Sequence, residues 1–292
     1  MSALILQTSD PHAYFPMLMV TSQTTREFCR RHGLAYESYI GIKRGYWNWH
    51  ATYNRIVMLN ELIEQGFRDW AIYVDADAYV VDLDFKIADY LQEKSEFAAI
   101  MIPSQATPNF WDVNAGVVLF NLLRPTARFI IQDWLRRFEK IPDEVLRQTK
   151  VPFHGENDQV ILHRLLMDNK DLWPEIHLES PQLMNSGHAR FIRQHLSAYT
   201  PSLPDRIDAI TAAVNTVLGK QPADRGQHEQ FEIAVAALYR GILGRGPDKA
   251  GLEHFVSAIQ KRGLGVGLET VAKLLLGSPE YKRLLEIAKP AE

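Results

Sequence analysis

The sequence predicts an α/β protein with a mostly parallel sheet, followed by a small all-α domain. Short apolar runs of strand length alternate with helical patterns over the first 200 residues. Two prolines then fall in the short polar stretch at 199–204, and from 205 to about 288 the pattern is helical throughout. We therefore expect one domain at residues 1–200 and a second, helical domain at residues 201–292.

The expected elements follow one another in a strand–helix order. A buried strand at 3–7 leads into a loop, and the helical pattern at 16–32 stops at Gly33, a residue that commonly ends helices. Residues 35–42 alternate like a second strand, and the helical pattern at 49–65 stops at Gly66. The elements expected after these are strands at 70–74, 97–102 and 116–120 and helices at 126–140 and 157–167. This order favours a parallel sheet covered on both faces, with ligands beyond the carboxyl ends of its strands.

Two aspartates, Asp75 and Asp77, directly follow the expected strand at 70–74. In extended backbone, residues two apart point to the same face, so the two carboxylates are expected to lie side by side. Such a pair suits a hard divalent cation, which takes its remaining ligands from water and from the phosphates of a substrate. It would hold a nucleotide diphosphate and stabilise it as a leaving group. The alternative is an acidic turn after a strand, without a ligand.

Composition and charge narrow the classes of function. The 292 residues are 46% hydrophobic and 23% charged, which is ordinary for a soluble globular protein. The net charge of −3 argues against a nucleic-acid binder that works by bulk electrostatics. Cys29 is the single cysteine, so no internal disulfide is possible and a reducing compartment is expected. No apolar run approaches the roughly 20 residues that span a bilayer, and the N-terminus does not resemble a signal peptide. We expect a cytoplasmic protein, with a peripheral position at the inner membrane face as the alternative.

Four segments, in order along residues 1–200, resemble the motifs of GT-A fold glycosyltransferases. They are Asp75-Ala76-Asp77, the Asn-x-Gly run that begins at Asn114, the segment Glu156-Asn157-Asp158-Gln159, and the histidine-bearing segment 187–195. They are most similar to the galactosyl, xylosyl and mannosyl transferases, a group that includes the plant xyloglucan xylosyltransferases. Two features depart from that group. Tyr73 stands where a tryptophan is usual, and two late histidines stand where members have one.

The resemblance implies a Rossmann-like nucleotide-sugar domain and an enzyme that transfers a hexosyl or pentosyl group. The donor would be a nucleotide-diphosphate sugar, with UDP as the default of the family, and the anomeric configuration would be retained. The acceptor would be a glycan, a lipid-linked molecule or a protein. The cofactor would be Mn²⁺ or Mg²⁺. Its ligands would be Asp77, Asp75, which is shared with ribose and sugar hydroxyls, and His188 or His195.

The resemblance also assigns roles around the donor sugar. Asn114 and the backbone at Ala115 and Gly116 would line it, since glycine lets the chain approach closely. Asp158 would bind sugar hydroxyls or act as a base, and Gln159 would sit against the anomeric carbon. The structural alternatives are a turn before a strand for Asn114 and Gly116, and a first helical turn, where acidic residues are favoured, for Asp158.

Contacts to the nucleotide are expected from the ends of the early elements. A stretch rich in cations and aromatics, 42–50, offers Lys43 or Arg44 to the diphosphate and aromatic rings to a base or an acceptor sugar. Its alternative role is to seal a helix against the sheet. The donor-binding residues expected outside the sugar-lining segment are Thr8, Ser9, Lys43, Arg55, Asp75 and Ala76.

The helical domain carries a pattern of its own. Residues 238–252 and 277–281 resemble a bacterial helical domain of unknown function that is often appended to envelope-related proteins and to glycosyltransferases. Asp248 is expected to cap one helix, and Ser278 with Pro279 to start another. Because these signals are structural, we expect this domain to bind an acceptor or a protein partner, or to self-associate.

Two other classes of protein share part of this pattern. A catalytically inactive sugar- or nucleotide-binding scaffold on the same fold would not require the intact set of Asp75, Asp77, Asn114 and Asp158. A phosphohydrolase of the haloacid-dehalogenase type also places Asp-x-Asp after a strand, but has Thr or Val where this chain has Tyr79. Metal-dependent binding of nucleotide sugars, followed by turnover, distinguishes these classes from the transferase.

Overall fold

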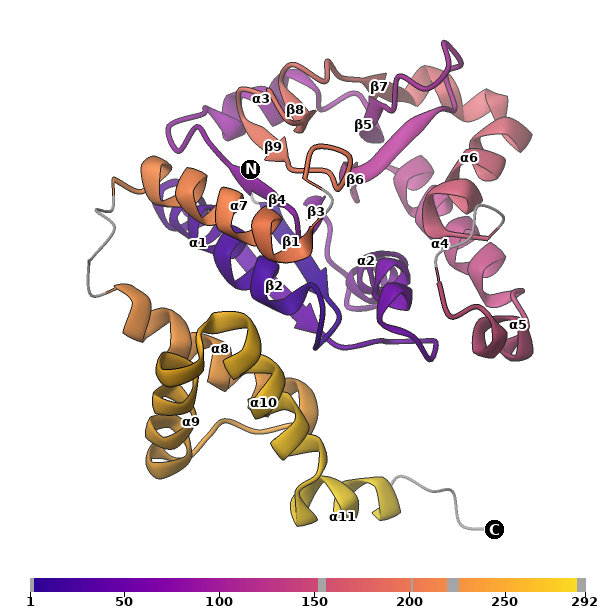
Figure 1. The fold of residues 1–292 in the computed structure, drawn as a ribbon. Helices are drawn as coiled ribbons and strands as arrows, with labels where there is room; N and C mark the ends of the chain where they lie inside the picture. The colour runs from indigo at the N-terminus through magenta and orange to yellow at the C-terminus, as the bar shows by residue number, and fades with distance from the viewer. Residues whose placement is uncertain (1–2, 152–155, 201, 220–225, 288–292) are drawn as a thin grey trace.

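The computed structural model describes residues 3–151, 156–200, 202–219 and 226–287, and a six-stranded sheet forms its centre (Figure 1). The strands, in spatial order, are β2 (Ala35–Ile40), β1 (Ala3–Ser9), β3 (Trp70–Val74), β6 (Val113–Asn121), β5 (Ala99–Pro103) and β7 (Ile176–Leu178). β1 pairs in parallel with β2 and β3, and β5 with β7, whereas β6 runs antiparallel to both of its neighbours. The predicted α/β class with a mostly parallel sheet is confirmed.

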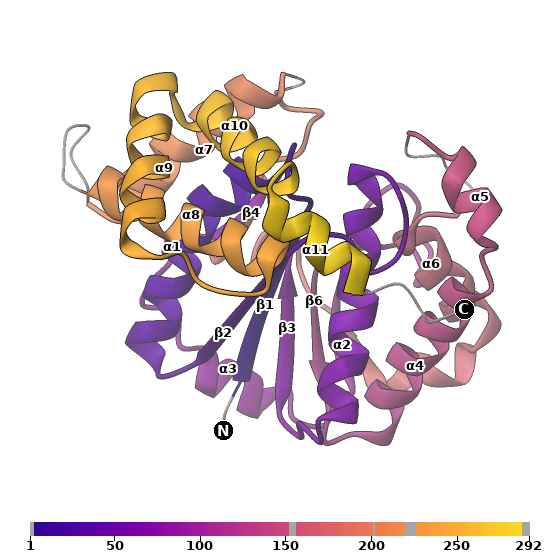
Figure 2. The same ribbon diagram turned by 90° about the horizontal axis from the view of Figure 1, so that it is seen from below.

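Helices cover both faces of this sheet (Figure 2). One face carries α2 (Asn54–Glu64), α4 (Pro125–Glu139) and α6 (Asp158–Asp168), and the other carries α1 (Phe15–His32) and α3 (Ile87–Glu93). The connections hold three short helices, η1 (Asn48–Tyr53), α5 (Asp143–Gln148) and η2 (Lys170–Glu175). The sheet therefore has a separate apolar core on each side.

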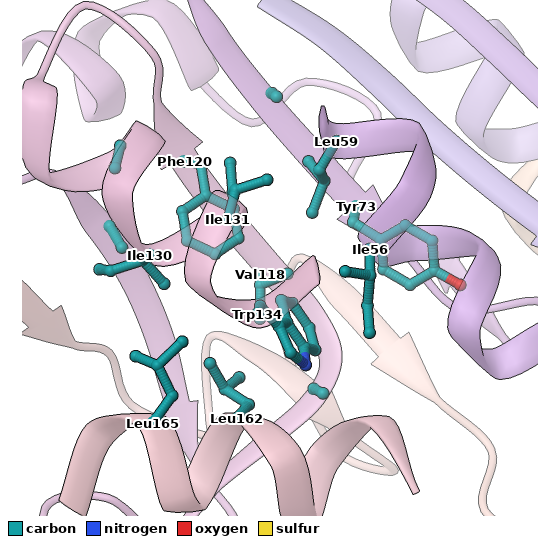
Figure 3. Close-up of a cluster of buried hydrophobic side chains, with 14 of the residues drawn as sticks. Ile56, Leu59, Tyr73, Val118, Phe120, Ile130, Ile131, Trp134, Leu162 and Leu165 are labelled. Atoms are coloured by element: carbon teal, nitrogen blue, oxygen red, sulfur yellow. The ribbon is translucent and has the colours of Figure 1, made fainter. Parts of the chain in front are cut away.

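The sequence of β3 reflects these two cores. Tyr73 points into the core beneath α2 and α4, where Figure 3 shows it with Ile56 of α2. Ile72 points into the opposite core. A strand buried on both faces is apolar at every position, so the first acidic residue, Asp75, appears where the strand leaves the sheet.

A second sheet follows directly on the aspartates. It consists of β4 (Ala78–Val80), β9 (Ile192–Gln194) and β8 (Met184–Ser186). β4 pairs antiparallel with β9, and Ala78 lies opposite Gln194. The backbone N–H of His195 donates to the carbonyl oxygen of Asp77 at 2.9 Å. This pairing brings a late segment of the chain to the carboxyl end of β3.

The helices described after residue 200 are α7 (Leu203–Val217), α8 (Gly226–Leu243), α9 (Lys249–Arg262), α10 (Leu264–Leu276) and α11 (Pro279–Ile287), so the helical prediction for this part is confirmed. α7 packs along α1 (Figure 1). α8, α9 and α10 enclose a further apolar core, which also takes Phe15, Leu18 and Met19 of α1. A Cβ atom at Gly241 of α8 would lie 2.8 Å from the carbonyl oxygen of Ile40, so α8 approaches the end of β2 closely. Within the described ranges, none of the helices combines the length and apolar character that a membrane crossing requires.

Candidate functional site

Asp75 and Asp77 lie in a tight turn between β3 and β4. The N–H of Asp75 donates to the carbonyl of Gly116 at 2.8 Å, which fixes the turn to β6. The two carboxylates face one side chain from β9, because Gln194 Nε2 donates to Asp75 Oδ2 at 3.2 Å and to Asp77 Oδ1 at 3.1 Å. The structure therefore brings the two aspartates together, with an amide between them.

A buried arginine ties the first aspartate to the start of α6. Arg55 of α2 donates through Nη2 to Asp75 Oδ1 at 2.7 Å, and its Nε lies 3.1 Å from Asp158 Oδ2. Its guanidinium also lies over the Tyr73 ring, 4.5 Å from the centroid, and the Tyr73 hydroxyl donates to Asp75 Oδ1 at 3.0 Å. Thr52 completes the cluster with a hydrogen bond to Asp158. The geometry places Asp75, Asp158 and Arg55 in one charged network.

The charges of this network favour a further cation. Burial raises the pKa of Asp75, and the carboxylates of Asp77 and Asp158 raise it further, against the opposing effect of Arg55. Burial also raises the pKa of Asp77, against hydrogen bonding from Gln194 and the charge of Arg206. Crowded carboxylates of this kind are the chemistry that a hard divalent cation neutralises. The donor set of Asp75 and Asp77 therefore fits such an ion, with water and phosphate oxygens as the other ligands.

Among the described residues, neither predicted histidine ring forms a hydrogen bond or an ion pair with the two carboxylates, although the His195 ring lies close enough to Asp77 to interact with its charge. His188 lies exposed in a turn, and the ring of His195 is hydrogen-bonded through Nε2 to Thr200 Oγ1 at 3.0 Å. In the described part of the chain, no group of three or more His, Cys, Asp or Glu side chains has metal-binding geometry. At the position we expected a histidine to occupy, the structure places Gln194.

Two hollows meet at the aspartates. The β1 hollow is lined by the end of β1 and the residue after it, by Tyr14 and by the start of α2. Its lining includes Thr8, Ser9, Asp10, Tyr14, Arg55 and Ala76. The β6 hollow lies on the other side and is lined by Asn114, Gly116, Asp158, Gln159 and Gln194. Asp75, Asp77, Arg55, Thr52 and Trp49 line both. The aspartates thus form part of the wall that the two hollows share.

Polar groups in the β6 hollow hold one another in place. Asn114 Nδ2 donates to Gln194 Oε1 at 3.2 Å, which orients the Gln194 amide nitrogen toward the aspartates. Gln159 Oε1 accepts from the backbone N–H of Ala115 at 3.1 Å. The carbonyl of Ala115 accepts from Arg55, so Ala115 acts through its backbone. The structure thus brings the sequence-predicted Asn114, Ala115 and Gln159 to one place, together with Gln194.

The last two residues of β1 differ in the hydrogen-bonding groups that they leave free for a ligand. Thr8 Oγ1 donates to the carbonyl of Tyr39 at 2.8 Å and accepts from Asn54 Nδ2 at 2.9 Å, so it serves the structure of the sheet end. Ser9 Oγ is buried and has no hydrogen-bond partner among the described residues. Buried hydroxyls are almost always hydrogen-bonded, so Ser9 is the better candidate to meet a ligand.

The cations of the 42–50 stretch lie elsewhere. Lys43 Nζ donates to Glu61 at 2.7 Å and does not line either hollow. Arg44 donates to the carbonyl of Phe138 at 2.8 Å and to Asp143 at 3.2 Å. The stretch contributes an aromatic instead, since Trp49 lines both hollows. Lys43 is therefore not brought to the site that we predicted for it.

Two residues near the aspartates were not predicted from the sequence, although each has a signal. Gln194 lies two residues after Ile192 in β9, and both are buried, so strand alternation places them on one face. Arg206 is buried on α7 with Ile210 and Val214, at the four-residue spacing of one helix face. Its Nη1 lies 3.7 Å from Asp77 Oδ2.

No protein-family model and no curated protein matches this chain. Among solved structures, it is similar to a glycosyltransferase involved in the glycosylation of the major capsid of PBCV-1, at 14% identity and a TM-score of 0.53, over 73% of this chain and 100% of that one. It is also similar to the galactosyltransferase LgtC in complex with donor and acceptor sugar analogues, at 13% identity and a TM-score of 0.48, over 78% of this chain and 99% of that one. The first likeness shows that the chain has the fold of a glycosyltransferase, as its motifs predict.

Proposed function

We propose that this protein transfers a sugar from a nucleotide-diphosphate sugar to an acceptor, with a divalent cation bound by Asp75 and Asp77. One observation carries the proposal: the two carboxylates stand in the wall shared by the β1 and β6 hollows. A nucleotide in the β1 hollow and a sugar in the β6 hollow would be joined at this wall by a diphosphate. That is where charge develops as the sugar leaves.

Different residues of the chain would bind the nucleoside, bind the cation and position the two carboxylates. Ser9, at the end of β1, would accept or donate a hydrogen bond to the nucleoside. A bound Mn²⁺ or Mg²⁺ supplies a Lewis acid that neutralises the leaving diphosphate. Gln194 holds the two carboxylates in register, and Arg55 holds Asp75 against Asp158. Such prior positioning means that the side chains need little rearrangement when the donor binds.

The sugar would contact side chains at the start of β6, which lies beside the carboxyl end of β3 because the two strands are antiparallel. Asn114 and Gln159 are fixed by hydrogen bonds at the edge of the hollow, where hydroxyl groups of a sugar would meet them. Asp158 is held by Arg55 and Thr52, and would bind sugar hydroxyls or act as the base. We infer a UDP-sugar and retention of configuration from the resemblance of the motifs. The acceptor would be a glycan, a lipid-linked molecule or a protein in the cytoplasm.

Donor hydrolysis tests the proposal. The purified protein with Mn²⁺ is screened against UDP-, GDP- and dTDP-sugars, and nucleotide release is measured with and without EDTA. We expect release from one donor, loss of release with EDTA, and a fall of about 100-fold or more in Asp77→Asn. Asp89→Asn, at an exposed position on α3, is the matched control and should keep full activity.

Two outcomes would contradict the proposal. Full release by a folded Asp77→Asn protein would contradict the proposal that a divalent cation bound by Asp77 is needed for the reaction. No release from any donor, together with no nucleotide binding by calorimetry, would favour an inactive scaffold on the same fold.

A further inference from the structure

One buried cation beside the site has an unusual environment. Arg206 of α7 is only 3% exposed, and its Nη1 lies 3.7 Å from Asp77 Oδ2, near the outer limit of an ion pair. Its guanidinium lies 5.2 Å from the centroid of the Tyr14 ring. Its Nε has no hydrogen-bond partner among the described residues. Since a buried donor without a partner is costly, this arginine needs an explanation beyond packing.

The position of Arg206 is fixed by the core. Ile210 and Val214 lie on the same face of α7 and pack with Met17 of α1 and Tyr79 of β4 in one apolar cluster. The guanidinium is therefore carried by a rigid helix rather than by a loop. Arg206 itself is not part of the lining of the β1 hollow, but both of its neighbours, Tyr14 and Asp77, line it.

The other cations that the sequence offered as contacts to the donor are already engaged. Arg55 pairs with both Asp75 and Asp158 and also donates to the carbonyl of Ala115. Lys43 pairs with Glu61. Within the described ranges, Arg206 is thus the cation next to the lining of the β1 hollow whose Nε–H donor has no hydrogen-bond partner.

We propose that Arg206 binds the diphosphate of the nucleotide-sugar donor, so that α7 belongs to the donor site. This inference rests on the proposed transferase function. A guanidinium presents several N–H donors in a planar fork, which matches the oxygens of a phosphate. The long contact to Asp77 orients Arg206 toward the shared wall, and phosphate oxygens would give its unpaired Nε a charge-assisted hydrogen bond.

Nucleotide affinity separates this role from a structural one. We would measure the dissociation constant of UDP, GDP and dTDP by calorimetry, and that of the matching nucleoside by ligand-detected NMR, in wild type, Arg206→Gln and Arg206→Lys. For the diphosphate that wild type binds, Arg206→Gln should weaken affinity by about 10- to 100-fold, the range for a lost charge-assisted hydrogen bond. The nucleoside should bind as in wild type, and Arg206→Lys should recover part of the affinity.

The control is Arg190→Gln, which removes the same charge from an exposed arginine, whereas Arg206 is buried against Asp77. It should leave diphosphate affinity unchanged. Unchanged affinity in a folded Arg206→Gln protein, or equal losses for diphosphate and nucleoside, would overturn the role of Arg206 and leave the transferase proposal standing. Failure of wild type to bind any of the three diphosphates would overturn the transferase proposal itself, and this inference with it.

Discussion

Gly116 and Gln194 are packed so closely that a Cβ atom at position 116 would displace the Gln194 amide. A Cβ atom built there would overlap Gln194 Nε2 and lie 2.9 Å from Asn185 Oδ1. The backbone of Gly116 is not in the left-handed region, so the requirement comes from space and not from φ. The amide that bridges Asp75 and Asp77 therefore depends on a missing side chain in β6.

Replacing Gly116 by alanine should displace this amide. We expect Gly116→Ala to reduce nucleotide release by about 10- to 100-fold, because displacement of a positioning group by a fraction of an ångström already weakens catalysis. The measurement is the rate of release at saturating donor. Gly246→Ala, where a Cβ atom meets nothing within 4 Å, is the control and should match wild type. An unaltered rate in Gly116→Ala would mean that the Gln194 bridge is dispensable.

His50 should make the stability of the protein depend on pH. Its ring is fully buried, and Nδ1 accepts from the backbone N–H of Tyr46 at 2.8 Å. Burial lowers the pKa of His50 from 6.5 to about 4. Between pH 6.5 and about pH 4, the His50 ring is therefore protonated in the unfolded chain and neutral in the folded protein. Stability is complete above pH 6.5 and falls as the pH drops toward 4, at up to about 1.4 kcal/mol per pH unit.

Urea unfolding at pH 7 and pH 5 measures this effect. Asparagine at position 50 retains an oxygen that accepts a hydrogen bond but does not titrate, so His50→Asn is the comparison. The free energy of unfolding of wild type should fall by about 1–2 kcal/mol more than that of the variant between the two pH values. Carboxylates such as Asp75 titrate in both proteins, so their contribution cancels in the difference. Equal pH dependence in the two proteins would contradict the assignment to His50.

The contact between Gly241 and Ile40 should control how α8 is attached to the sheet. An added Cβ atom would press on the carbonyl oxygen of Ile40, and backbone yields less readily than a side chain. We expect Gly241→Ala to destabilise the protein by about 1–3 kcal/mol, measured by urea unfolding, and to speed proteolysis of the helices after residue 225. Gly265→Ala, also helical but with nothing within 4 Å, should be neutral or slightly stabilising. If both variants behave alike, α8 is not held closely against β2.

Much of the fold could be predicted because a sheet covered on both faces leaves a clear pattern of apolar runs. β3 is buried along its whole length, and its run ends where the aspartates begin. The direction of β6 could not be predicted, because an apolar run reads the same in parallel and antiparallel pairing. The three-residue strand β4 was missed because its stability comes from pairing with β9, which lies far along the chain.

The site, like the fold, could be predicted from the sequence only in part. The residues that the structure gathers around Asp75 and Asp77 lie at the ends of strands and at the starts of helices. The apolar and polar pattern of the sequence indicates these positions. The late segment was expected to reach the aspartates through a histidine, but the side chain that it places between them is the amide of Gln194. In a strand, neighbouring side chains face opposite sides, so Gln194 faces the aspartates and His195 faces Thr200. Lys43 looked suitable by charge alone, but its ammonium is captured by Glu61, a pairing that only the packed structure reveals.

The packing of the C-terminal helices on α1 decides where the chain could be shortened without exposing an apolar surface. Phe15, Leu18 and Met19 are buried by the helices after residue 225, immediately beyond the Asp10 to Tyr14 loop that lines the β1 hollow. A chain ended at residue 200 would uncover this apolar face and lose Arg206 from the vicinity of Asp77. The segments that carry the recognisable motifs therefore do not pack as a unit separate from the C-terminal helices. The C-terminal helices therefore cover the apolar face of α1 and place a buried cation next to Asp77.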